Sequence, residues 1–421
     1  MTSGAQGHRF PVLHHLVFAV ARLVGSVSRM TGRGAGLTLP GRVTLLLHPA
    51  ALRRLTQDRS VVLVSGTNGK TTTTRLLTAA LGFSGPVVSN GSGSNLEAGL
   101  VSALLGTPRR QLAVLEVDEV VLPRALASCR PVAVVLLNLS RDQLDRTSEV
   151  SFHVARWQLA LGAYDGSVVA NADDPLVVAA VRGGRPTESD VIWVAAGQTW
   201  WGDVPLCPTC GASWSAPEGP WSCMACGSQR PEPAWSLVGD TLLSRSGESA
   251  TLALALPGRA SAANAAMAAA AAHLQGVPVE AALERMRSVT DVEGRYLSSR
   301  QGEHDLRLVL AKNPAGWLEA LTELVRGADP VVIALNARAA DGIDPSWLWD
   351  VPFERLRGRP VVITGERAAD LAVRLFYAEV PHTVHPDLAT CVAALPPGAC
   401  SVVANYTAFV QARESLARGI A

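Results

Sequence analysis

Short apolar runs recur along the chain, and polar or helix-like stretches separate them. In the first half of the sequence these runs are residues 60–65, 112–115, 132–137 and 167–170. Continuous runs of this length are typical of strands in a parallel sheet that helices cover on both faces. A second series follows at residues 306–310, 331–335, 361–364 and 401–404. The pattern therefore predicts two α/β units in succession.

Between the two series the pattern changes. Residues 198–236 are rich in Trp, Pro and Gly and contain four of the seven cysteines. We interpret them as an insertion with its own fold. Apolar residues at helical spacing over 10–27 predict an N-terminal helix, and the glycines and prolines of 31–49 predict a loop-rich entry segment. The predicted domains are an N-terminal helix and loop-rich segment at 1–55, a central domain at 56–300 that contains the insertion, and a C-terminal domain at 301–421.

Composition adds bounds on partners and location. The chain has 421 residues, 48% of them hydrophobic, and a formal net charge of +1. Positive and negative residues are mixed, so we expect no nucleic-acid partner. His14, His15 and Arg22 interrupt the apolar stretch at 10–27, which fits a packed helix or a membrane-surface helix better than a span. We therefore expect a cytoplasmic protein.

The first apolar run leads into Gly-Thr-Asn-Gly-Lys-Thr-Thr at residues 66–72, and a helix is predicted at 71–81. Strand, loop and helix in this order form a cradle for phosphate, because backbone N–H groups and the positive end of the helix face the anion. Lys70 would neutralise the β- and γ-phosphates, and the Thr71 hydroxyl would hold Mg²⁺. The full Walker pattern requires a glycine where Val64 stands, so only its shorter form is present. The predicted ATP contacts are Thr67, Asn68, Gly69, Lys70, Thr71 and Thr72.

Acidic and amide side chains stand at the ends of the next two apolar runs. The carboxyl ends of parallel strands border the ligand crevice, so side chains there can reach a bound metal or phosphate. Glu116 is the predicted second magnesium ligand, with Asp118 nearby. Asn138 and Asp142 end the following run and are candidates to position metal-bound water or the γ-phosphate.

Four cysteines form two C-x-x-C pairs separated by twelve residues, and a glycine follows each pair. Four thiolates with this spacing match a tetrahedral Zn²⁺ site, while redox dithiols and an iron–sulfur cluster are the alternatives. Because protein fills all four positions, the predicted role is structural, since a small insertion with little apolar core needs such a cross-link. The predicted zinc ligands are Cys207, Cys210, Cys223 and Cys226.

The loop at 66–73 resembles the ATP loop of the Mur ligases and the folylpolyglutamate synthases. Asn264, in an Ala-rich helix predicted at 261–274, resembles their adenine-contacting Asn, and Gly294-Arg295 resembles the pair that closes their central domain. The resemblance implies a Mur-ligase-like P-loop domain and a C-terminal Rossmann-like domain, with ATP in the cleft between them and Asn264 and Arg295 among its contacts. It also implies that a carboxylate and ATP form an acyl phosphate, which an amine then attacks.

The MurT branch of the Mur ligases is the closer match. The glycines of 32–36 with the Leu-Pro-Gly of 39–41, the four-cysteine insertion, and the runs 312–316 and 336–350 all resemble it. This implies the synthetase subunit of a lipid II isoglutaminyl synthase, which phosphorylates the α-carboxyl of D-glutamate in the lipid II stem peptide. Ammonia would come from glutamine, hydrolysed by a GatD-type glutaminase subunit in a heterodimer. Because lipid II is membrane-anchored, work at the inner face of the plasma membrane is implied.

Asp350 is the implied catalytic residue. In the branch, the Asp that ends the Ser-Trp-x-Trp-Asp stretch lies near the partner's Cys-His pair, where a carboxylate orients the imidazole. From the residues alone, the two tryptophans beside an acid also fit a packed loop, and Asp341 and Asp344 are competing acids. Lys312 and Asn313 are candidates for contacts to substrate or phosphate.

Two departures from the Mur ligases limit what the resemblance implies. Their Asp-His-Leu-Asp is Asp-Gln-Leu-Asp at residues 142–145 here, so the histidine metal ligand is missing. The next helix, predicted at 150–161, holds Arg156 and no lysine. A carbamylated lysine that bridges a second magnesium, as in some Mur ligases, is therefore not expected.

Two other functions fit the same motifs. A stand-alone Mur-type amino-acid ligase would use an amino acid as nucleophile and need no partner, which the zinc insertion and the 346–350 stretch argue against. An ATP-binding regulatory or scaffold subunit would bind nucleotide without releasing phosphate in the presence of the lipid substrate. No cysteine of the sequence stands in a Gly-x-Cys-x-Gly elbow, as expected if a partner supplies the glutaminase nucleophile.

Overall fold

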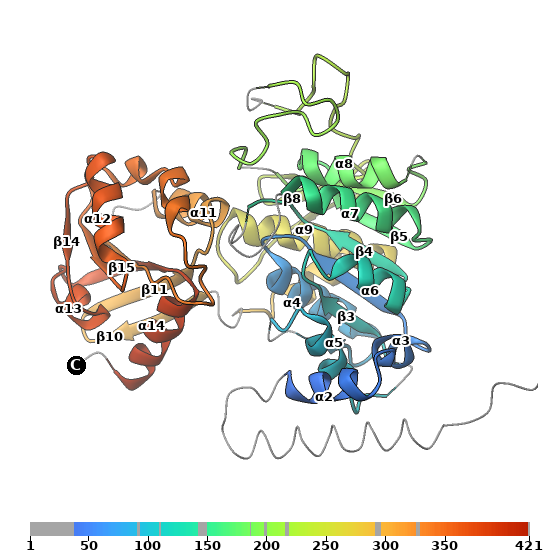
Figure 1. The fold of residues 1–421 in the computed structure, drawn as a ribbon, viewed down its shortest axis with the longest axis horizontal. Coiled ribbons are helices and arrows are strands. Elements are labelled where there is room, and N and C mark those ends of the chain that lie inside the picture. The colour runs from blue at the N-terminus through green and yellow to red at the C-terminus, as the bar shows by residue number, and fades with distance from the viewer. Residues whose placement is uncertain are drawn as a thin grey trace, which may run out of the picture.

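The computed structural model (Figure 1) describes residues 38–90, 93–108, 111–141, 150–185, 187–197, 200–214, 219–290, 296–325 and 329–419. A nine-stranded sheet and a six-stranded sheet each form the centre of one α/β unit, which confirms the predicted fold class. The helix predicted at 10–27 lies outside the described residues. Within the described ranges, no helix is long and apolar enough to cross a membrane.

Nine strands form the sheet of the first, central unit. They are β1 (Val61–Ser65), β2 (Val88–Ser89), β3 (Ala113–Glu116), β4 (Ala133–Leu136), β5 (Ser167–Asn171), β6 (Val191–Ala195), β7 (Trp235–Val238), β8 (Thr241–Ser244) and β9 (Ser249–Thr251). Their order is β2-β3-β1-β4-β5-β6-β7-β8-β9, and only β8 and β9 join it antiparallel. β1, β3 and β4 are wholly buried, as their continuous apolar runs predict.

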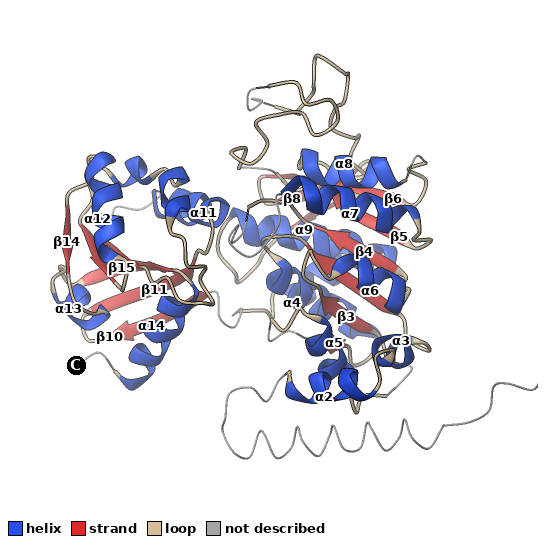
Figure 2. Ribbon diagram, viewed as in Figure 1, coloured by secondary structure: helices blue, strands red, loops and turns tan. Residues whose placement is uncertain are grey.

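Helices cover both faces of this sheet (Figure 2). Val61 and Leu63 of β1 pack into one core, while Val62 and Val64 pack into the other, because successive side chains of a strand point to opposite faces. The first core holds α3 (Ala51–Thr56), α5 (Glu97–Leu104), α6 (Leu122–Cys129), α7 (Val150–Gly162) and α8 (Pro175–Gly184). The second holds α4 (Lys70–Leu81), which a 3₁₀ turn η1 (Gly82–Ser84) follows, α9 (Arg259–Leu274) and α10 (Val279–Met286).

The loop predicted over 31–49 is wrong for its second part, which forms the helix α2 (Leu39–Leu47). Pro40 lies in the first turn of α2, where the missing N–H of proline costs no helical hydrogen bond. Gly41 lies so close to α5 that a Cβ there would come within 1.8 Å of the Ala98 carbonyl oxygen, and its N–H donates to Ser102 Oγ at 2.8 Å. Proline and glycine therefore start and pack a helix here instead of preventing one.

The cysteine-containing insertion connects β6 to β7 and rises from one end of the central unit (Figure 1). Two short antiparallel bridges, Leu206 with Ser213 and Ser222 with Gln229, fold each cysteine pair into a hairpin-like turn. The base of the insertion is anchored in the first core by Val204 and Trp221, whose indole N–H donates to the Ala172 carbonyl at 3.0 Å. The insertion is therefore fixed to the central unit, although its tip projects away.

Six strands form the sheet of the second unit, in the order β10-β11-β15-β12-β13-β14, with β10 as an antiparallel edge. Four helices and two 3₁₀ turns pack on it. The strands are β10 (Tyr296–Gln301), β11 (His304–Leu310), β12 (Val331–Ala334), β13 (Val361–Thr364), β14 (His382–Val384) and β15 (Gly398–Ala404). One core holds α11 (Pro314–Val325), η2 (Ser346–Asp350), η3 (Phe353–Leu356) and α12 (Ala368–Tyr377), and the other holds α13 (Leu388–Ala393) and α14 (Tyr406–Arg418).

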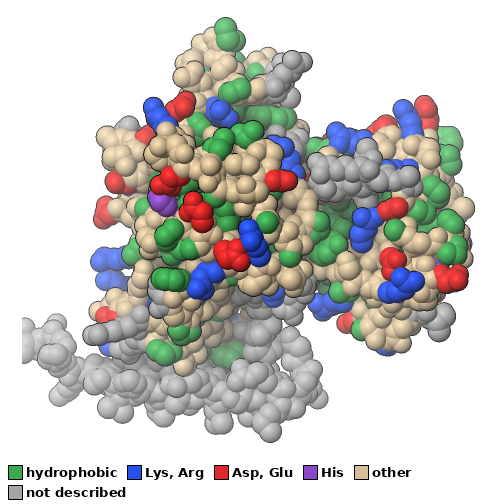
Figure 3. Space-filling view, turned by 180° about the vertical axis from the view of Figure 1, so that it is seen from behind, with side chains coloured by type: hydrophobic (Ala, Val, Ile, Leu, Met, Phe, Trp, Pro, Cys, Tyr) green, Lys and Arg blue, Asp and Glu red, His purple; other side chains and the backbone are tan. Residues whose placement is uncertain are grey.

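Basic and acidic side chains are interspersed over both units on the face shown in Figure 3. The second sheet already begins at Tyr296, within the range that the sequence analysis assigned to the central domain. The domain limits drawn from the sequence stay predictions.

Candidate functional site

The glycine-rich loop lies between β1 and α4, and its conformation depends on two glycines. Gly69 has a φ of +84°, and a Cβ there would come within 2.3 Å of Asn264 Oδ1 on α9. Gly66 has a φ of +141°, and a Cβ there would come within 2.9 Å of the Asn138 nitrogen. A side chain at either position would be strained and would displace its neighbour. The loop is thus shaped by glycine on both sides.

Asn138, at the end of β4, fixes this loop. Its side-chain oxygen accepts from the Asn68 N–H at 2.8 Å, and its amide donates to the Asn68 carbonyl at 3.0 Å. The Asn138 carbonyl accepts from the Thr67 N–H at 2.9 Å. Three hydrogen bonds from one residue therefore set the loop before any ligand arrives. Asn138 holds the loop's backbone, and the phosphate or water contact predicted for it stays a prediction.

Lys70 is almost fully buried at the first residue of α4. Its Nζ donates to the Gly66 carbonyl at 2.6 Å and to Glu119 Oε2 at 2.8 Å. Burial disfavours the charged amine, but the Glu119 carboxylate outweighs burial and raises the pKa of Lys70 above its ordinary value. Burial likewise disfavours the Glu119 carboxylate, and Lys70 with Lys312 outweighs it and lowers the pKa of Glu119. The loop lysine is therefore held charged inside the protein.

Sequence reasoning missed Glu119, because it follows the strand by several residues and no periodicity marks it. The one available signal was its place in the acidic run Glu-Val-Asp-Glu at 116–119. Trp157 of α7 donates its indole N–H to the Glu119 carbonyl at 3.1 Å. Lys312 lies in the second unit, so its influence on the Glu119 pKa shows that a charge of that unit lies near Glu119 and the glycine-rich loop.

Glu116 ends β3 with its carboxylate buried beside the loop. Oε1 accepts from Asn95 Nδ2 at 3.2 Å, whereas Oε2 is buried and has no hydrogen-bond partner among the described residues. The Asn90 side chain holds the backbone of Glu116: its oxygen accepts from the Glu116 N–H at 2.7 Å, and its amide donates to the Glu116 carbonyl at 2.8 Å. A buried, unpartnered carboxylate oxygen is costly unless a cation joins it, so this residue fits a magnesium ligand. Thr71, the other predicted ligand, is buried one residue after Lys70.

A cavity of about 110 Å³ opens beside the loop, between the ends of β4 to β6, the start of α9 and the start of α11. It borders Asn264 and therefore lies where the adenine contact was expected. Small-molecule sites usually measure about 300–1,000 Å³, so this enclosed space would hold only part of a nucleotide. The lining includes Asn68, Asn138, Asn171, Trp200, Arg259 and Asn264.

Two predicted residues, Asp142 and Arg295, lie outside the described residues. Thr72 is buried in the first turn of α4, next to Thr71. Asn313, by contrast, reaches the loop from the second unit: its amide donates to Asn68 Oδ1 at 3.2 Å and its oxygen accepts from Asn68 Nδ2 at 3.4 Å. The same oxygen accepts from the Gly316 N–H at 2.9 Å in the first turn of α11. One amide pair thus bridges the two units at the loop.

Asp350 lies at the end of η2, across the cleft from the central unit. Its Oδ2 is 3.1 Å from an Arg141 guanidinium nitrogen, and its side chain is 41% exposed. Both residues border a second cavity of about 120 Å³, together with Lys312 and Asn313. The segment 312–316 contributes to the lining of both cavities, so it lies between the glycine-rich loop at 66–72, the predicted nucleotide loop, and the cavity that Asp350 borders.

The competing acids of the same stretch have structural partners. Asp341 is buried, and it accepts from the Thr407 N–H at 2.8 Å and from the Arg338 N–H at 3.1 Å. Asp344 accepts from the N–H and the hydroxyl of Ser346, both at 2.8 Å, and these bonds lower its pKa. Their carboxylates hold the loop together. Asp350 is the acid of the three that pairs across the cleft.

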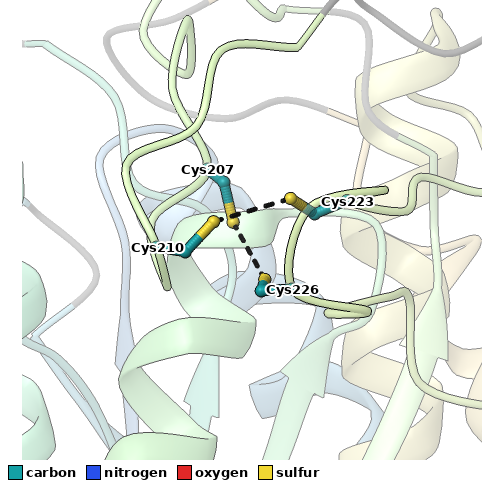
Figure 4. Close-up of side chains that lie close together, drawn as sticks. All are labelled: Cys207, Cys210, Cys223 and Cys226. Atoms are coloured by element: carbon teal, nitrogen blue, oxygen red, sulfur yellow. Dashed lines mark hydrogen bonds between the residues drawn. The ribbon is translucent and has the colours of Figure 1, made fainter.

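The four paired cysteines turn their sulfur atoms toward one another from two loops (Figure 4). All four sulfurs lie within 4.8 Å of one another, with 3.8 Å between Cys207 and Cys226 and 3.7 Å between Cys210 and Cys223. Zn–S bonds of about 2.3 Å in a tetrahedron separate neighbouring sulfurs by about 3.8 Å. The donor set and its spacing therefore fit a tetrahedral metal ion with no position left open.

Comparison with known proteins agrees with this geometry. The family model described as Mur ligase middle domain matches residues 64–200, and the one described as MurT ligase C-terminal matches residues 310–409. The chain is 29% identical to a Staphylococcus aureus (strain N315) protein named lipid II isoglutaminyl synthase (glutamine-hydrolyzing) subunit MurT, over 95% of this chain and 97% of that one. The protein of that name from Streptococcus pneumoniae (strain ATCC BAA-255 / R6) is also 29% identical, over 91% and 93%.

Solved structures share the fold at lower identity. A pseudomurein peptide ligase type C from Methanothermus fervidus matches with a TM-score of 0.67 and 19% identity, covering 85% of this chain and 78% of that one. MurF from Acinetobacter baumannii matches with a TM-score of 0.66 and 15% identity, covering 90% and 80%. The solved structures show the shared fold, and the two family models with the relatives that match along most of the chain show that it belongs to the MurT branch of the Mur ligase family.

Proposed function

We propose that this chain is the synthetase subunit of a glutamine-dependent amidotransferase that acts on lipid II. It would transfer the γ-phosphoryl group of ATP to the α-carboxylate of D-glutamate in the stem peptide, giving an acyl phosphate and ADP. Ammonia from a GatD-type glutaminase subunit would attack the acyl carbon, phosphate would leave, and the nitrogen would lose a proton to give D-isoglutamine. The proposal extends the activity printed for the full-length relatives to this chain.

One structural observation supports this proposal independently of the similarity to known proteins. The nucleotide loop and Asp350 border neighbouring cavities in one cleft, and the segment 312–316 lies between them. A phosphorylating centre and a group for a partner's active site would then work close together. Such proximity suits a reaction in which ammonia must reach an acyl phosphate before water does.

The residues of the loop would divide the work on ATP. Backbone N–H groups at the start of α4 and the ammonium of Lys70 would bind the β- and γ-phosphates, and Lys70 would exchange Glu119 for a phosphate oxygen. Glu116 Oε2 and the Thr71 hydroxyl would hold Mg²⁺, which neutralises charge on the transferred phosphoryl group. Asn264 would contact adenine, and Lys312 and Asn313 would approach the acyl phosphate from the second unit.

The four cysteines would hold a structural Zn²⁺. Protein fills every ligand position of a tetrahedral ion there, so substrate has no place on it. The metal would cross-link an insertion that buries little of its own surface, while Val204 and Trp221 anchor its base in the central core.

The three remaining cysteines support the need for a glutaminase partner. Cys129, Cys391 and Cys400 are buried, and burial raises the pKa of each thiol to about 12. Thiols of this kind remain protonated at neutral pH and are poor nucleophiles. The nucleophile for glutamine hydrolysis would therefore belong to another subunit.

The surface around Asp350 suits docking of such a subunit. Trp349 precedes Asp350 and is 54% exposed, and Phe376 and Tyr377 at the end of α12 are 73% and 67% exposed. The ring centroids of Trp349 and Tyr377 are 5.6 Å apart, so the three aromatic side chains form one surface. Exposed aromatic clusters of this kind are typical of protein interfaces. The glutaminase subunit would cover this aromatic surface and reach Asp350.

The direct test is amidation of purified lipid II by this chain together with a GatD-type subunit, ATP and glutamine, followed by mass spectrometry of the stem peptide. We expect D-isoglutamine only when both subunits and ATP are present. Amidation by the chain alone with glutamine would contradict the two-subunit proposal. Condensation of an amino acid by the chain alone would instead favour the stand-alone ligase.

A further inference from the structure

Arg141 joins three parts of the molecule that are far apart in sequence. It follows the strand end that fixes the nucleotide loop. Its backbone N–H donates to Asp203 Oδ2 at 2.9 Å, and its guanidinium Nε pairs with Asp203 Oδ1. Another guanidinium nitrogen lies 3.1 Å from Asp350 Oδ2 in the second unit. Arg141 therefore contacts the base of the zinc insertion and the acid implied in partner catalysis at the same time.

Asp203 makes this arginine rigid. Its side chain is only 1% exposed, and it also accepts from the Trp200 indole N–H at 2.6 Å. A guanidinium presents its donors in a planar fork, so fixing Nε on one carboxylate also fixes the direction of the remaining donors. Those donors point to Asp350, on the other side of the cleft. Contacts within the central unit are thus sufficient to orient Arg141 toward Asp350.

Among the described residues, Asp350 is held through one of its two carboxylate oxygens. An ionised carboxylate accepts through two oxygens, and Arg141 occupies Oδ2, while the side chain keeps 41% of its surface exposed. The carboxylate is therefore oriented by Arg141, and no described residue occupies Oδ1, which can accept from a donor outside the chain. A histidine N–H of a partner subunit is such a donor.

The residue before Arg141 belongs to the nucleotide loop's own hydrogen bonds. The Ser140 N–H donates to Thr67 Oγ1 at 3.0 Å, and Thr67 Oγ1 donates to the Ser140 carbonyl at 3.2 Å. A shift of the loop upon binding phosphate therefore moves the backbone from which Arg141 extends. Thr67, Ser140 and Arg141 therefore connect the glycine-rich loop to Asp350.

We propose that Arg141 is a positioning residue that orients Asp350 for the glutaminase subunit and links glutamine hydrolysis to the state of the nucleotide loop. This inference rests on the proposed function. Arg141 contacts neither glutamine nor the reacting atoms. It holds the ionised Asp350 so that the partner's histidine meets a carboxylate in one orientation, and the proton transfers of glutamine hydrolysis remain within the partner.

The test uses the complete complex and three assays: glutamine hydrolysis with and without ATP and lipid II, amidation of lipid II driven by glutamine, and amidation driven by added ammonium chloride. Arg141→Ala should reduce glutamine hydrolysis roughly fivefold or more, as expected for a half-exposed charge pair whose loss also frees the carboxylate. Amidation driven by ammonium should stay within about twofold of wild type, because the ligase centre is intact. Arg141→Lys should recover part of the lost hydrolysis, since a single charge without the fork restores attraction but not orientation.

Two controls separate positioning from damage. Arg124→Ala removes an exposed ion pair with Glu97 on the central unit and should change none of the three activities. Zinc content and ATP affinity of Arg141→Ala should match wild type, which shows that the insertion and the loop are folded.

Three outcomes would overturn the inference. Unchanged glutamine hydrolysis in Arg141→Ala would show that Asp350 needs no positioning. An equal loss of hydrolysis and ammonium-driven amidation would place Arg141 in the ligase centre. Equal stimulation of hydrolysis by ATP and lipid II in wild type and variant would remove the link to the loop. If the wild-type complex itself fails to amidate lipid II from either nitrogen source, the proposed function falls and not this inference alone.

Discussion

The nucleotide loop and the stretch that carries Asp350 border the same cleft, but they are held in opposite ways. Lys70 is buried and bonded to three groups of its own unit, and glycines with Asn138 set the surrounding backbone. Asp350 is partly exposed and pairs with the other unit. A group that acts on a ligand inside the chain can be fixed by its own domain. A group that serves a partner, as we propose for Asp350, has to remain accessible, so a contact from outside its domain orients it.

The largest effect should come from a change at Lys70, the buried group of the two. Lys70→Ala removes the cation that would bind the β- and γ-phosphates, so amidation from both glutamine and ammonium should fall by about a hundredfold to a thousandfold. Rates of D-isoglutamine formation measured by mass spectrometry test this, with Arg124→Ala as the matched loss of an exposed charge. A variant that keeps full amidation would show that the loop does not bind the reacting nucleotide.

Asp350→Asn should separate the two nitrogen sources. The amide keeps the shape of the side chain but loses the charge that stabilises a protonated histidine, so glutamine hydrolysis should fall by roughly a hundredfold or more. ATP binding and amidation driven by ammonium should persist.

Asp344→Asn is the matched control for this substitution, because it changes a neighbouring acid that bonds only to Ser346 among the contacts described above. It should leave hydrolysis within about threefold of wild type. Equal losses in the two variants would mean that the stretch acts as a whole and that Asp350 has no distinct role.

Removing one cysteine tests whether the insertion binds zinc and whether that metal stabilises the chain. Cys223→Ser should lower zinc content and reduce the melting temperature of the chain by several degrees, because a structural zinc site contributes folding free energy. Metal analysis and calorimetry measure the two effects. Cys391→Ser, which changes a buried cysteine outside the cluster, should leave zinc content unchanged. A metal content that survives Cys223→Ser would rule out the four-cysteine site.

The smallest effect concerns the ion pair of Lys70 with Glu119. The pKa of Glu119 is lowered in the folded protein, so this carboxylate contributes stability that is present above its unfolded pKa near 4.5 and is lost as pH falls through the folded value. The pKa of Lys70 is raised, so its contribution is lost only as pH rises above 10.5. Urea unfolding from pH 6 to 3 should show a steeper loss of stability for wild type than for Glu119→Gln. Parallel curves would mean that the pair is not intact in solution.

The regular parts of the fold could be predicted from the sequence because burial on both faces leaves a continuous apolar run. β1, β4 and β12 are examples, each wholly buried. β10 and β14 were missed, since they lie at the edges of a sheet and carry polar, partly exposed residues. α2 was missed because its proline and glycine were interpreted without knowledge of the helix that packs against them.

The candidate site divides in the same manner. Local motifs gave the loop, the four cysteines and Glu116, whose neighbours in sequence are also neighbours in space. Glu119 and Arg141 could not be found this way, because their importance depends on pairs that only the folded chain creates. The likeness to a family singled out Asp350, whereas the residues alone left Asp341 and Asp344 as competing acids. In the structure those two acids bond to neighbouring groups of their own unit, and Asp350 pairs with Arg141 of the other unit.

The amide pair of Asn68 and Asn313 bears on how the cleft between the two units opens and closes. Both partners are uncharged, so neither salt nor pH near neutrality weakens their two hydrogen bonds. Each such bond contributes only about 1 kcal/mol net, because water replaces it when it breaks. The contact between Asn68 and Asn313 is thus weak and reversible, and it does not depend on ionic strength. The amide pair can therefore break and re-form under any ionic condition, whereas the Arg141–Asp350 ion pair across the same cleft weakens as salt is added.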